Sequence, residues 1–344
     1  NGEASIVDKN HVLCGDETYE CDNLLLCTGS ETFIPPIPGI DTVPYWTHRD
    51  ALDNKELPKS LVVIGGGVIG MEFASFFNSL GVEVTVIEML DEILGGMDKE
   101  LSAMLRAEYA KRGIKFMLNT KVVSLDGSTG ENGETQVRVN YENAEGTGFS
   151  VAEKLLMSVG RHPVTKGFGL ENLNPEKTER GNIRVDGQMR TSVPGVYACG
   201  DLTGFSLLAH TAVREAEVAV HAVLGKKDCM SYRAIPGVVY TNPEIAGVGD
   251  TEEALQKKGI PYRTVKLPMA YSGRFVAENE GVNGMCKLLL AEDDTVLGAH
   301  VLGNPASEII TLAGMAVELK LTAAEWKKIV FPHPTVGEIF KEAL

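Results

Sequence analysis

Residues 61–88 have the sequence LVVIGGGVIGMEFASFFNSLGVEVTVIE. The stretch opens with a short apolar, β-branched run at 61–64, which is typical of a buried parallel strand. A G-x-G-x-x-G pattern follows at 65–70, and a second apolar run at 82–87 predicts another strand. The residues between the two runs favour a helix that begins near Val68. This order predicts the nucleotide-binding unit of a doubly wound α/β fold.

The three glycines of the pattern each have a physical reason. Gly65 permits the tight turn, Gly67 lets backbone N–H groups approach a pyrophosphate, and Gly70 lets the helix pack closely on the sheet. Val68 and Ile69 form the helix N-terminus, whose positive dipole end faces the phosphates. A loop that needs glycine for its backbone alone is the alternative, but the flanking strands and helix favour a nucleotide site.

The second strand ends in an acidic residue, Glu88, about 20 residues after the first glycine of the turn. Its carboxylate is placed to accept hydrogen bonds from ribose hydroxyls, and it would repel a 2′-phosphate. Met89 and Leu90 follow and offer no arginine for such a phosphate. The sequence therefore predicts NAD rather than NADP as the dinucleotide.

The composition argues against several classes of protein. The 344 residues include 32 Lys and Arg against 47 Asp and Glu, and the net charge of −15 disfavours nucleic acid or an anionic membrane surface as a partner. No apolar run approaches the roughly 18 residues that a transmembrane helix needs. The six cysteines contain no C-x-x-C pair and no zinc-type spacing, so we expect no metal site and a reduced, cytoplasmic protein.

Two segments on either side of the nucleotide unit are predicted to form one further domain. The first, residues 1–40, has short strands and an apolar strand at 23–27 but no helix to cover them. The second, residues 162–226, has a strand at 195–199 and a helix at 209–224. Four apolar side chains of this helix lie on one stripe, which we expect to face the sheet: Val213, Ala216, Val220 and Val223.

Residues 41–161 are predicted to hold the nucleotide unit itself. A helix at 98–112 is expected, with Asp98 as its N-cap and Gly113 just beyond its end. Three alternating segments predict an antiparallel flap on the parallel sheet: 121–125, 136–141 and 153–159. From residue 227 onward strands are followed by helices, which indicates a separate α+β domain.

The chain resembles the flavoprotein disulfide reductases over essentially all of its length, and within them it is most similar to the dihydrolipoamide dehydrogenases. Besides the glycine turn, the motifs that carry this resemblance are Thr28-Gly29, Gly160-Arg161-His162-Pro163, Val196-Tyr197-Ala198-Cys199-Gly200-Asp201, Leu208-Ala209-His210, and His333-Pro334-Thr335 with Glu338. The resemblance implies an α/β fold with a Rossmann-like NAD-binding domain (41–161) inserted in a partial FAD-binding domain (1–40 and 162–226). A C-terminal α+β dimerisation domain (227–344) follows.

The resemblance also implies roles for particular residues. Asp201 would accept a hydrogen bond from the ribityl chain of FAD, and backbone groups around Leu208 and Ala209 would face the pyrimidine edge of the flavin. Glu72 matches a glutamate near the nicotinamide and flavin. Without the resemblance, Asp201 is an ordinary turn residue or helix cap and Glu72 a solvated residue. The remaining cofactor-binding residues implied by the motifs are Thr28, Gly29, Gly160 and His210.

His333 and Glu338 are the implied catalytic residues. In the family, the histidine takes a proton from the dithiol substrate, and the glutamate orients the ring and stabilises its charged form. By spacing alone, a His-Pro-Thr segment is more typical of a turn. The family places this tail in the active site of a second subunit, which implies a homodimer. Phe331 stands where many lipoamide dehydrogenases have another histidine, which affects the fine substrate assignment.

The chain departs from the family in one respect. Full-length members begin with an FAD-binding βαβ unit and a helix carrying a redox-active C-x-x-x-x-C, whereas these 344 residues contain a single G-x-G-x-x-G and no two cysteines five positions apart. They also begin without Met or a targeting peptide. We therefore expect a fragment of natural, engineered or proteolytic origin, which binds NAD, binds FAD weakly or not at all and does not turn over lipoamide.

For the complete protein, the resemblance implies a component of 2-oxo-acid dehydrogenase complexes that passes electrons from dihydrolipoyl groups through a disulfide and FAD to NAD. Its partners would be the lipoyl-bearing subunits. Another disulfide reductase is an alternative, but glutathione reductases prefer NADP and mercuric reductases add a C-terminal cysteine pair. A non-catalytic, dimeric NAD-binding protein is the alternative from a different class.

Overall fold

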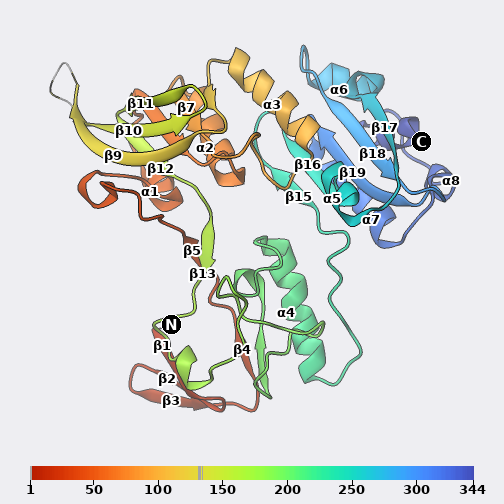
Figure 1. Cartoon of the computed structure of the whole chain (residues 1–344). Coiled ribbons are helices and arrows are strands. Elements are labelled where there is room, and N and C mark those ends of the chain that lie inside the picture. The colour runs from red at the N-terminus through yellow and green to blue at the C-terminus, as the bar shows by residue number, and fades with distance from the viewer. Residues whose placement is uncertain (1, 131–132, 134) are drawn as a thin grey trace. The chain divides into compact units, whose positions relative to one another are not determined.

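The structure is a computed structural model that describes residues 2–130, 133 and 135–344. The chain forms two compact units, each built from two separate stretches of sequence (Figure 1). The first unit comprises Asn1–Phe33 and Arg161–Tyr232, and the second comprises Ile34–Gly160 and Arg233–Leu344. Among the described residues, no helix is long and apolar enough to cross a membrane, and no group of ligand side chains is placed to hold a metal ion.

The first unit is organised around two parallel strands, β4 (Leu24–Leu26) and β14 (Val196–Ala198). Helix α4 (Ala209–Val223) packs against them and buries Val218, Ala219 and Ala222. The other strands form an antiparallel meander and an antiparallel pair: β1 (Ala4–Asp8), β2 (His11–Cys14) and β3 (Glu17–Glu20), then β5 (Ser30–Thr32) with β13 (Arg161–Pro163). Two short 3₁₀ turns complete the unit: η2 (Leu170–Asn172) and η3 (Gly200–Leu202).

The expected buried stripe of α4 is wrong. Val213, Val220 and Val223 are 61%, 49% and 42% exposed, and Ala216 is only partly buried. The buried face instead carries the residues Thr211, Glu215, Val218, Ala219 and Ala222. Two of these five are polar, so the apolar pattern pointed to the opposite face of the helix. Their burial is possible because both side chains find hydrogen-bond partners inside the unit.

The second unit contains a four-stranded parallel sheet in the order β12-β6-β7-β8. Its strands are β6 (Ser60–Ile64), β7 (Glu83–Ile87), β8 (Lys115–Met117) and β12 (Lys154–Met157). Helices α2 (Val68–Ser79) and α3 (Lys99–Lys111) share one apolar core with this sheet, around Val63 and Val86. Two shorter elements precede β6: η1 (Ile40–Thr42) and α1 (His48–Asp53).

The opposite face of the parallel sheet packs on a three-stranded antiparallel flap. The flap consists of β9 (Lys121–Thr129), β10 (Thr135–Asn143) and β11 (Gly146–Ala152). The expected third flap strand at 153–159 is wrong, since β12 pairs in parallel with β6 and places Leu155 opposite Val62. Three of the four residues of β12 are buried, because the strand is covered on both faces. A strand of this kind is indicated by a continuous apolar run and not by alternation of apolar and polar residues.

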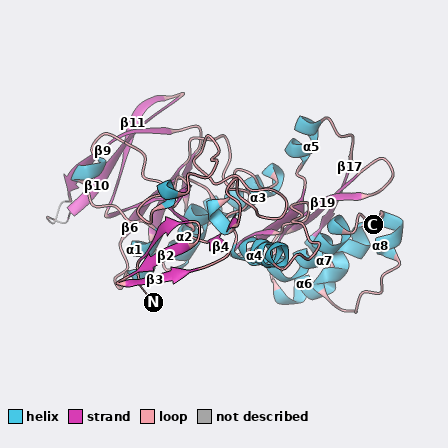
Figure 2. Ribbon diagram, turned by 90° about the horizontal axis from the view of Figure 1, so that it is seen from below, coloured by secondary structure: helices cyan, strands magenta, loops and turns pink. Residues whose placement is uncertain are grey.

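The rest of the second unit is a five-stranded antiparallel sheet in the order β15-β16-β19-β18-β17. Its strands are β15 (Gly237–Val239), β16 (Ile245–Gly249), β17 (Arg263–Pro268), β18 (Met285–Leu290) and β19 (Val296–Leu302). Several helices gather beside the sheet (Figure 2): α5 (Glu252–Lys258), α6 (Gly273–Glu278), α7 (Ala306–Glu318), α8 (Ala323–Lys327) and α9 (Ile339–Ala343). Two 3₁₀ turns, η4 (Met269–Tyr271) and η5 (Val336–Glu338), connect them.

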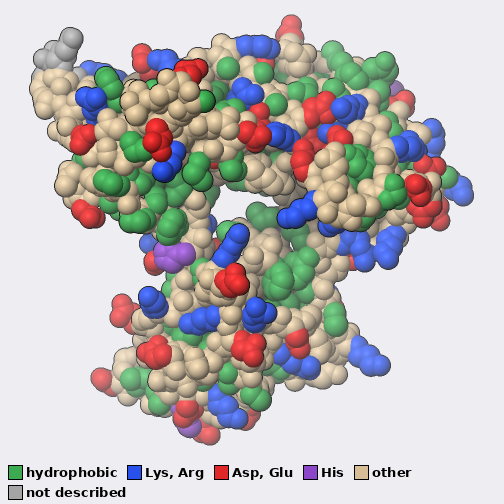
Figure 3. All heavy atoms as spheres, in the orientation of Figure 1, with side chains coloured by type: hydrophobic (Ala, Val, Ile, Leu, Met, Phe, Trp, Pro, Cys, Tyr) green, Lys and Arg blue, Asp and Glu red, His purple; other side chains and the backbone are tan. Residues whose placement is uncertain are grey.

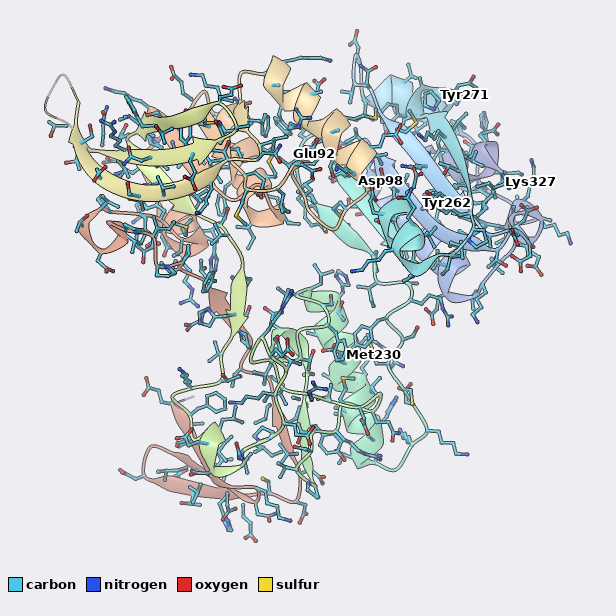
Figure 4. All side chains as sticks on the ribbon, in the orientation of Figure 1. Glu92, Asp98, Met230, Tyr262, Tyr271 and Lys327 are labelled. Carbon is cyan, nitrogen blue, oxygen red and sulfur yellow. The ribbon has the colours of Figure 1, made fainter. Side chains whose placement is uncertain are left out.

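A buried lysine joins α3 to the five-stranded sheet. Lys287 of β18 is 2% exposed, and its Nζ lies 2.8 Å from Asp98 Oδ2 and 3.0 Å from Glu100 Oε2, and also pairs with Glu252. Burial alone would lower the pKa of Lys287, but the three carboxylates raise it above its ordinary value. Asp98 caps α3 as predicted, accepting the Leu101 N–H at 3.1 Å. Acidic and basic side chains gather where α3 meets the sheet (Figure 3). Asp98 lies at the end of α3, next to the sheet (Figure 4).

Candidate functional site

The glycine turn joins the carboxyl end of β6 to the start of α2, as the sequence predicts. Gly65 has a φ of 101°, in the left-handed region, and a Cβ atom there would lie 2.5 Å from the Ser158 carbonyl oxygen. A Cβ atom at Gly70 would lie 2.0 Å from the Gly65 carbonyl oxygen. Real side chains do not fit at such distances. Backbone packing therefore requires glycine at both positions.

Gly67 is a glycine for a different reason. A Cβ atom at Gly67 would meet nothing within 4 Å, so its backbone borders open space. It is the N-cap of α2, and no described side chain caps this helix at Val68 or Ile69. The first N–H groups of this helix of 12 residues are therefore available to a ligand. This arrangement fits the pyrophosphate of a dinucleotide.

Glu88 reaches the same turn from the end of β7. Its Oε2 accepts the Gly66 N–H at 2.6 Å, and its Oε1 accepts the Leu90 N–H at 2.8 Å. The two hydrogen bonds fix the carboxylate beside the glycine turn. Each oxygen of a carboxylate has a second lone pair, which leaves both able to accept bonds from ribose hydroxyls.

Glu72 and Gly160 lie elsewhere in the second unit. Glu72 Oε1 accepts the Tyr240 N–H at 2.9 Å, which ties α2 to the segment after β15. Burial raises the pKa of Glu72. Gly160 follows β12 with a φ of 132°, and the chain passes from the second unit to the first directly after it.

The residues expected to contact a flavin are grouped in the first unit. Thr28 and Gly29 come just after β4, whereas Gly200 and Asp201 come just after β14. Because the two strands are parallel neighbours, both turns lie at one edge of the pair. Gly29 and Gly200 have φ values of 70° and 72°, a conformation that favours glycine. Ligands of open α/β sheets bind at this carboxyl edge.

Asp201 is held by two residues whose roles the sequence did not reveal. Ser30 Oγ donates a hydrogen bond to Asp201 Oδ2 at 2.5 Å, and Arg161 Nε donates to Ser30 Oγ at 2.6 Å. Arg161 Nε also lies 3.9 Å from Asp201 Oδ2. The Asp201 side chain is 25% exposed, so it can still accept a hydroxyl group from a ligand. The only sequence signal was that Ser30 directly follows the Thr28-Gly29 motif and that Arg161 lies within the Gly160–Pro163 motif.

The start of α4 lies close to this edge through contacts between α4 and η3. Leu208 is the N-cap and Ala209 the first helical residue, and no described side chain caps this N-terminus. Ala209 and His210 are exposed. The N-terminus of this 15-residue helix therefore offers backbone N–H groups and a positive dipole end, as expected for the part of the site that stabilises negative charge on a flavin.

Glu215 of α4 binds the backbone of the Gly200–Asp201 turn, and it was not predicted as a site residue. Its Oε2 accepts the Gly200 N–H at 2.6 Å, and its Oε1 accepts the Tyr232 hydroxyl at 2.6 Å. The residue is 0% exposed, and its burial raises the pKa of the carboxyl group. A glutamate on a helix normally predicts a solvated face, and nothing local in the sequence distinguishes Glu215 from such a residue.

His333 and Glu338 meet at the C-terminal end of the second unit. The His333 Nδ1 and Glu338 Oε1 atoms are 2.9 Å apart, and Glu338 Oε2 accepts the Thr335 N–H at 2.7 Å. The Thr335 N–H and then the His333 ring lower the pKa of Glu338, which keeps it ionised. The His333 side chain is 82% exposed. With Nδ1 bonded to the carboxylate, Nε2 is the nitrogen that can exchange a proton with a substrate.

The chain is similar in sequence to known oxidoreductases. The family model described as pyridine nucleotide-disulphide oxidoreductase matches residues 1–216, and the model of the dimerisation domain of that family matches residues 235–344. The mitochondrial dihydrolipoyl dehydrogenase of Homo sapiens is 38% identical over 356 residues, covering 100% of this chain and 68% of that protein. The enzyme of Caenorhabditis elegans is 37% identical over 353 residues, covering 99% and 70%.

Solved structures show the same relationship. The HOCl-induced flavoprotein disulfide reductase RclA of Escherichia coli matches with a TM-score of 0.88 and 28% identity, covering 99% of this chain and 78% of that one. LpdA of Mycobacterium tuberculosis matches with a TM-score of 0.86 and 28% identity, covering 100% and 75%. The sequence, the fold and the order of the motifs of this chain all match those proteins. The chain therefore belongs to the pyridine nucleotide-disulphide oxidoreductase family.

Proposed function

We propose that the chain is part of an NAD-dependent dihydrolipoyl dehydrogenase, which oxidises the dihydrolipoyl groups of 2-oxo-acid dehydrogenase complexes. The observation that carries this proposal is the His333–Glu338 pair, with a 2.9 Å contact and a ring that is 82% exposed. An exposed histidine whose ring is oriented by an ionised, hydrogen-bonded carboxylate is suited to proton exchange with a dithiol. The identity of 38% to dihydrolipoyl dehydrogenases supports the choice of substrate class.

His333 would act as the proton acceptor for the substrate thiol. A thiol attacks a disulfide only as its thiolate, and an ordinary thiol has a pKa of about 8.5. A histidine side chain can take that proton and return it later. Glu338 keeps Nδ1 as the hydrogen-bonded nitrogen and balances the charge of the protonated ring.

Two cofactors fit the residues of this chain. A flavin and a nicotinamide, when bound, supply the two-electron chemistry that amino-acid side chains lack. The glycine turn and Glu88 would hold NAD through its pyrophosphate and ribose. The turns at Thr28–Gly29 and Gly200–Asp201, together with the N-terminus of α4, would contact FAD. Asp201 is already oriented by Ser30 for this purpose.

Thiol exchange with the substrate needs a reactive cysteine pair that these residues do not supply in the family spacing. No two of the six cysteines are five positions apart. We therefore infer that the 344-residue chain alone binds NAD but does not form NADH from dihydrolipoamide. Turnover above a blank without enzyme would contradict this inference.

The test has a binding arm and a catalytic arm. Calorimetry of the chain should show NAD binding, with NADP bound at least about tenfold more weakly because Glu88 repels the extra phosphate. The catalytic arm uses the chain preceded by the N-terminal part of a dihydrolipoyl dehydrogenase. In that fusion, His333→Gln should lower kcat with dihydrolipoamide by about 10²–10⁴-fold, as expected for the loss of an acid/base group. An unchanged kcat would overturn the assigned role.

The second unit also favours a homodimer. A groove of about 630 Å³ runs between α7 and the segment that follows α8, and it is lined mostly by apolar side chains. Met315, Leu319 and Val330 in this groove are 57%, 65% and 87% exposed. The groove lies within the region that matches the dimerisation domain, and Pro332 and Pro334 beside His333 line it. We infer that a second copy covers it and completes the surroundings of His333.

Sedimentation equilibrium tests the homodimer. Met315→Glu and Val330→Glu should each produce monomers, because a charge in an apolar interface has no partner. Leu52→Glu is the matched control, since Leu52 is 72% exposed on α1 and lies outside the groove. A chain that is already monomeric, or variants that stay dimeric, would contradict this interface.

A further inference from the structure

Two cysteines to which neither the sequence nor the proposed function gives a role lie side by side in the first unit. The Cys27 and Cys199 sulfur atoms are 3.3 Å apart, although 172 positions separate the residues in sequence. Cys27 follows β4 and Cys199 follows β14. The Cys199 N–H donates to the Leu26 carbonyl at 3.1 Å, which continues the parallel pairing of Ala198 with Leu26. The two thiols therefore stand opposite each other on neighbouring strands.

This geometry permits a bond between the two sulfur atoms. Neighbouring strands are about 4.8 Å apart, which falls within the Cα separation of about 4.4–6.8 Å that disulfides span. The sulfur atoms need to approach by little more than about 1 Å to reach the disulfide length of about 2.05 Å.

The two thiols differ in access and in acidity. Cys27 is exposed and Cys199 is 4% exposed. The hydrogen bond with Cys199 lowers the pKa of Cys27 to about 7, which favours the thiolate form of Cys27. The same bond, and then burial, raise the pKa of Cys199. The pair thus has an accessible attacking thiol and a protected second thiol.

We propose that Cys27 and Cys199 form a reversible dithiol–disulfide site that exchanges with low-molecular-weight disulfides. The Cys27 thiolate attacks one sulfur of a disulfide R–S–S–R. The R–S–S–R bond breaks, a Cys27–S–S–R bond forms, and RS⁻ leaves. Cys199 then attacks the Cys27 sulfur, which breaks the bond to R, forms Cys27–S–S–Cys199 and releases the second RS⁻.

The exchange is balanced in atoms and electrons. Two protein thiols are oxidised, one small disulfide is reduced to two thiols, and the two protons of the protein thiols end on the two RSH molecules. The second step becomes easier after the first, because the thiolate that raised the pKa of Cys199 no longer exists once Cys27 is in the mixed disulfide. The site lies directly before the turns at 28–29 and 200–201, but it does not depend on the binding of a cofactor there.

The experiment uses oxidised glutathione as the small disulfide and the 344-residue chain with Cys229→Ser, because Cys229 is exposed and would form a mixed disulfide by itself. The reduced protein is treated, quenched with acid, labelled with a maleimide after denaturation and digested. We expect five labelled thiols before treatment and three after it, a peptide joining Cys27 to Cys199, and recovery of five thiols with dithiothreitol.

Two variants distinguish the steps. Cys199→Ala should accumulate Cys27 bound to one glutathione, and Cys27→Ser should leave Cys199 unmodified because it is buried. Retention of all five thiols, a lasting mixed disulfide at Cys27 in the parent chain, or a cross-link between Cys14 and Cys21 instead would overturn the proposal. The peptide map of the parent chain decides the question even where a variant fails to fold.

Discussion

The Gly66 backbone N–H donates a hydrogen bond of 2.6 Å to Glu88 Oε2, joining the glycine turn to the end of the neighbouring strand. The carboxylate that would bind ribose is thus fixed before any dinucleotide arrives. A ligand that binds a preorganised group does not have to order it first, which favours affinity.

Glu88→Ala should therefore weaken NAD binding by about tenfold or more, because a hydrogen bond to a charged group contributes about 1.5–3 kcal/mol. It should also reduce discrimination against NADP, since the repelling charge is gone. Calorimetric titration with both dinucleotides measures the two effects. Asp91→Ala is the control, because Asp91 pairs with Lys99, its side chain is 63% exposed, and its replacement should leave both affinities unchanged.

The glycine turn offers a second pair of variants. Gly70→Ala places a Cβ atom 2.0 Å from the Gly65 carbonyl oxygen, and such overpacking should destabilise the second unit by about 1–3 kcal/mol. Gly67→Ala meets no atom within 4 Å and should keep the stability of the parent chain while lowering its NAD affinity. Urea unfolding and NAD titration of both variants test this. Equal stability of the two variants would contradict the packing role of Gly70.

The buried Lys287 is expected to contribute more to the free energy of unfolding than the more exposed Lys266. Lys287→Met leaves the carboxylates of Asp98, Glu100 and Glu252 without their buried partner and should cost about 3–5 kcal/mol of unfolding free energy. Lys266→Met removes only a pair with Glu100 whose side chains are 44% and 40% exposed, which should cost about 0–1 kcal/mol. Chemical unfolding of the two variants measures the difference, and similar values would contradict it.

The buried Glu215 should make the first unit sensitive to pH. Its folded-state pKa is raised above the ordinary 4.5, so the folded state holds a proton that the unfolded state releases. The contribution of Glu215 to the free energy of unfolding is therefore fully present below pH 4.5. It is lost as the pH rises from 4.5 through the raised pKa of the folded state. Glu215→Gln, which keeps an acceptor for Gly200, should flatten this slope. Thermal unfolding followed between pH 4 and 8 checks the sign, and a slope that survives the substitution would assign it to other groups.

Much of the second unit could be predicted from local sequence. The apolar run at 61–64, the glycines that follow it and the cap at Asp98 each act within a few residues, so their patterns specify the strand, the turn and the helix. The third strand of the flap was predicted incorrectly, because β12 is buried on both faces and so lacks alternation.

The site residues that could not be predicted depend on long-range contacts. Arg161 reaches Ser30 across 131 positions, and Cys199 reaches Cys27 across 172. No spacing rule in one sequence reports such pairs. The buried face of α4 was hidden for another reason, since Glu215 is polar and becomes compatible with burial only through the Gly200 N–H and the Tyr232 hydroxyl.

The division of the first unit into two stretches has a consequence for biosynthesis. The strand β4 is synthesised before its partner β14, which follows about 170 residues later, after the whole of 34–160 has been made. At a translation rate of about 5–20 residues per second, β4 waits roughly 9–34 s for its neighbour. Through that interval its three leucines lack β14, the strand that pairs with β4 in the described structure, whereas the parallel sheet at 60–157 can already assemble. An unpaired apolar strand favours aggregation, so we expect a chaperone to help the nascent chain during this interval.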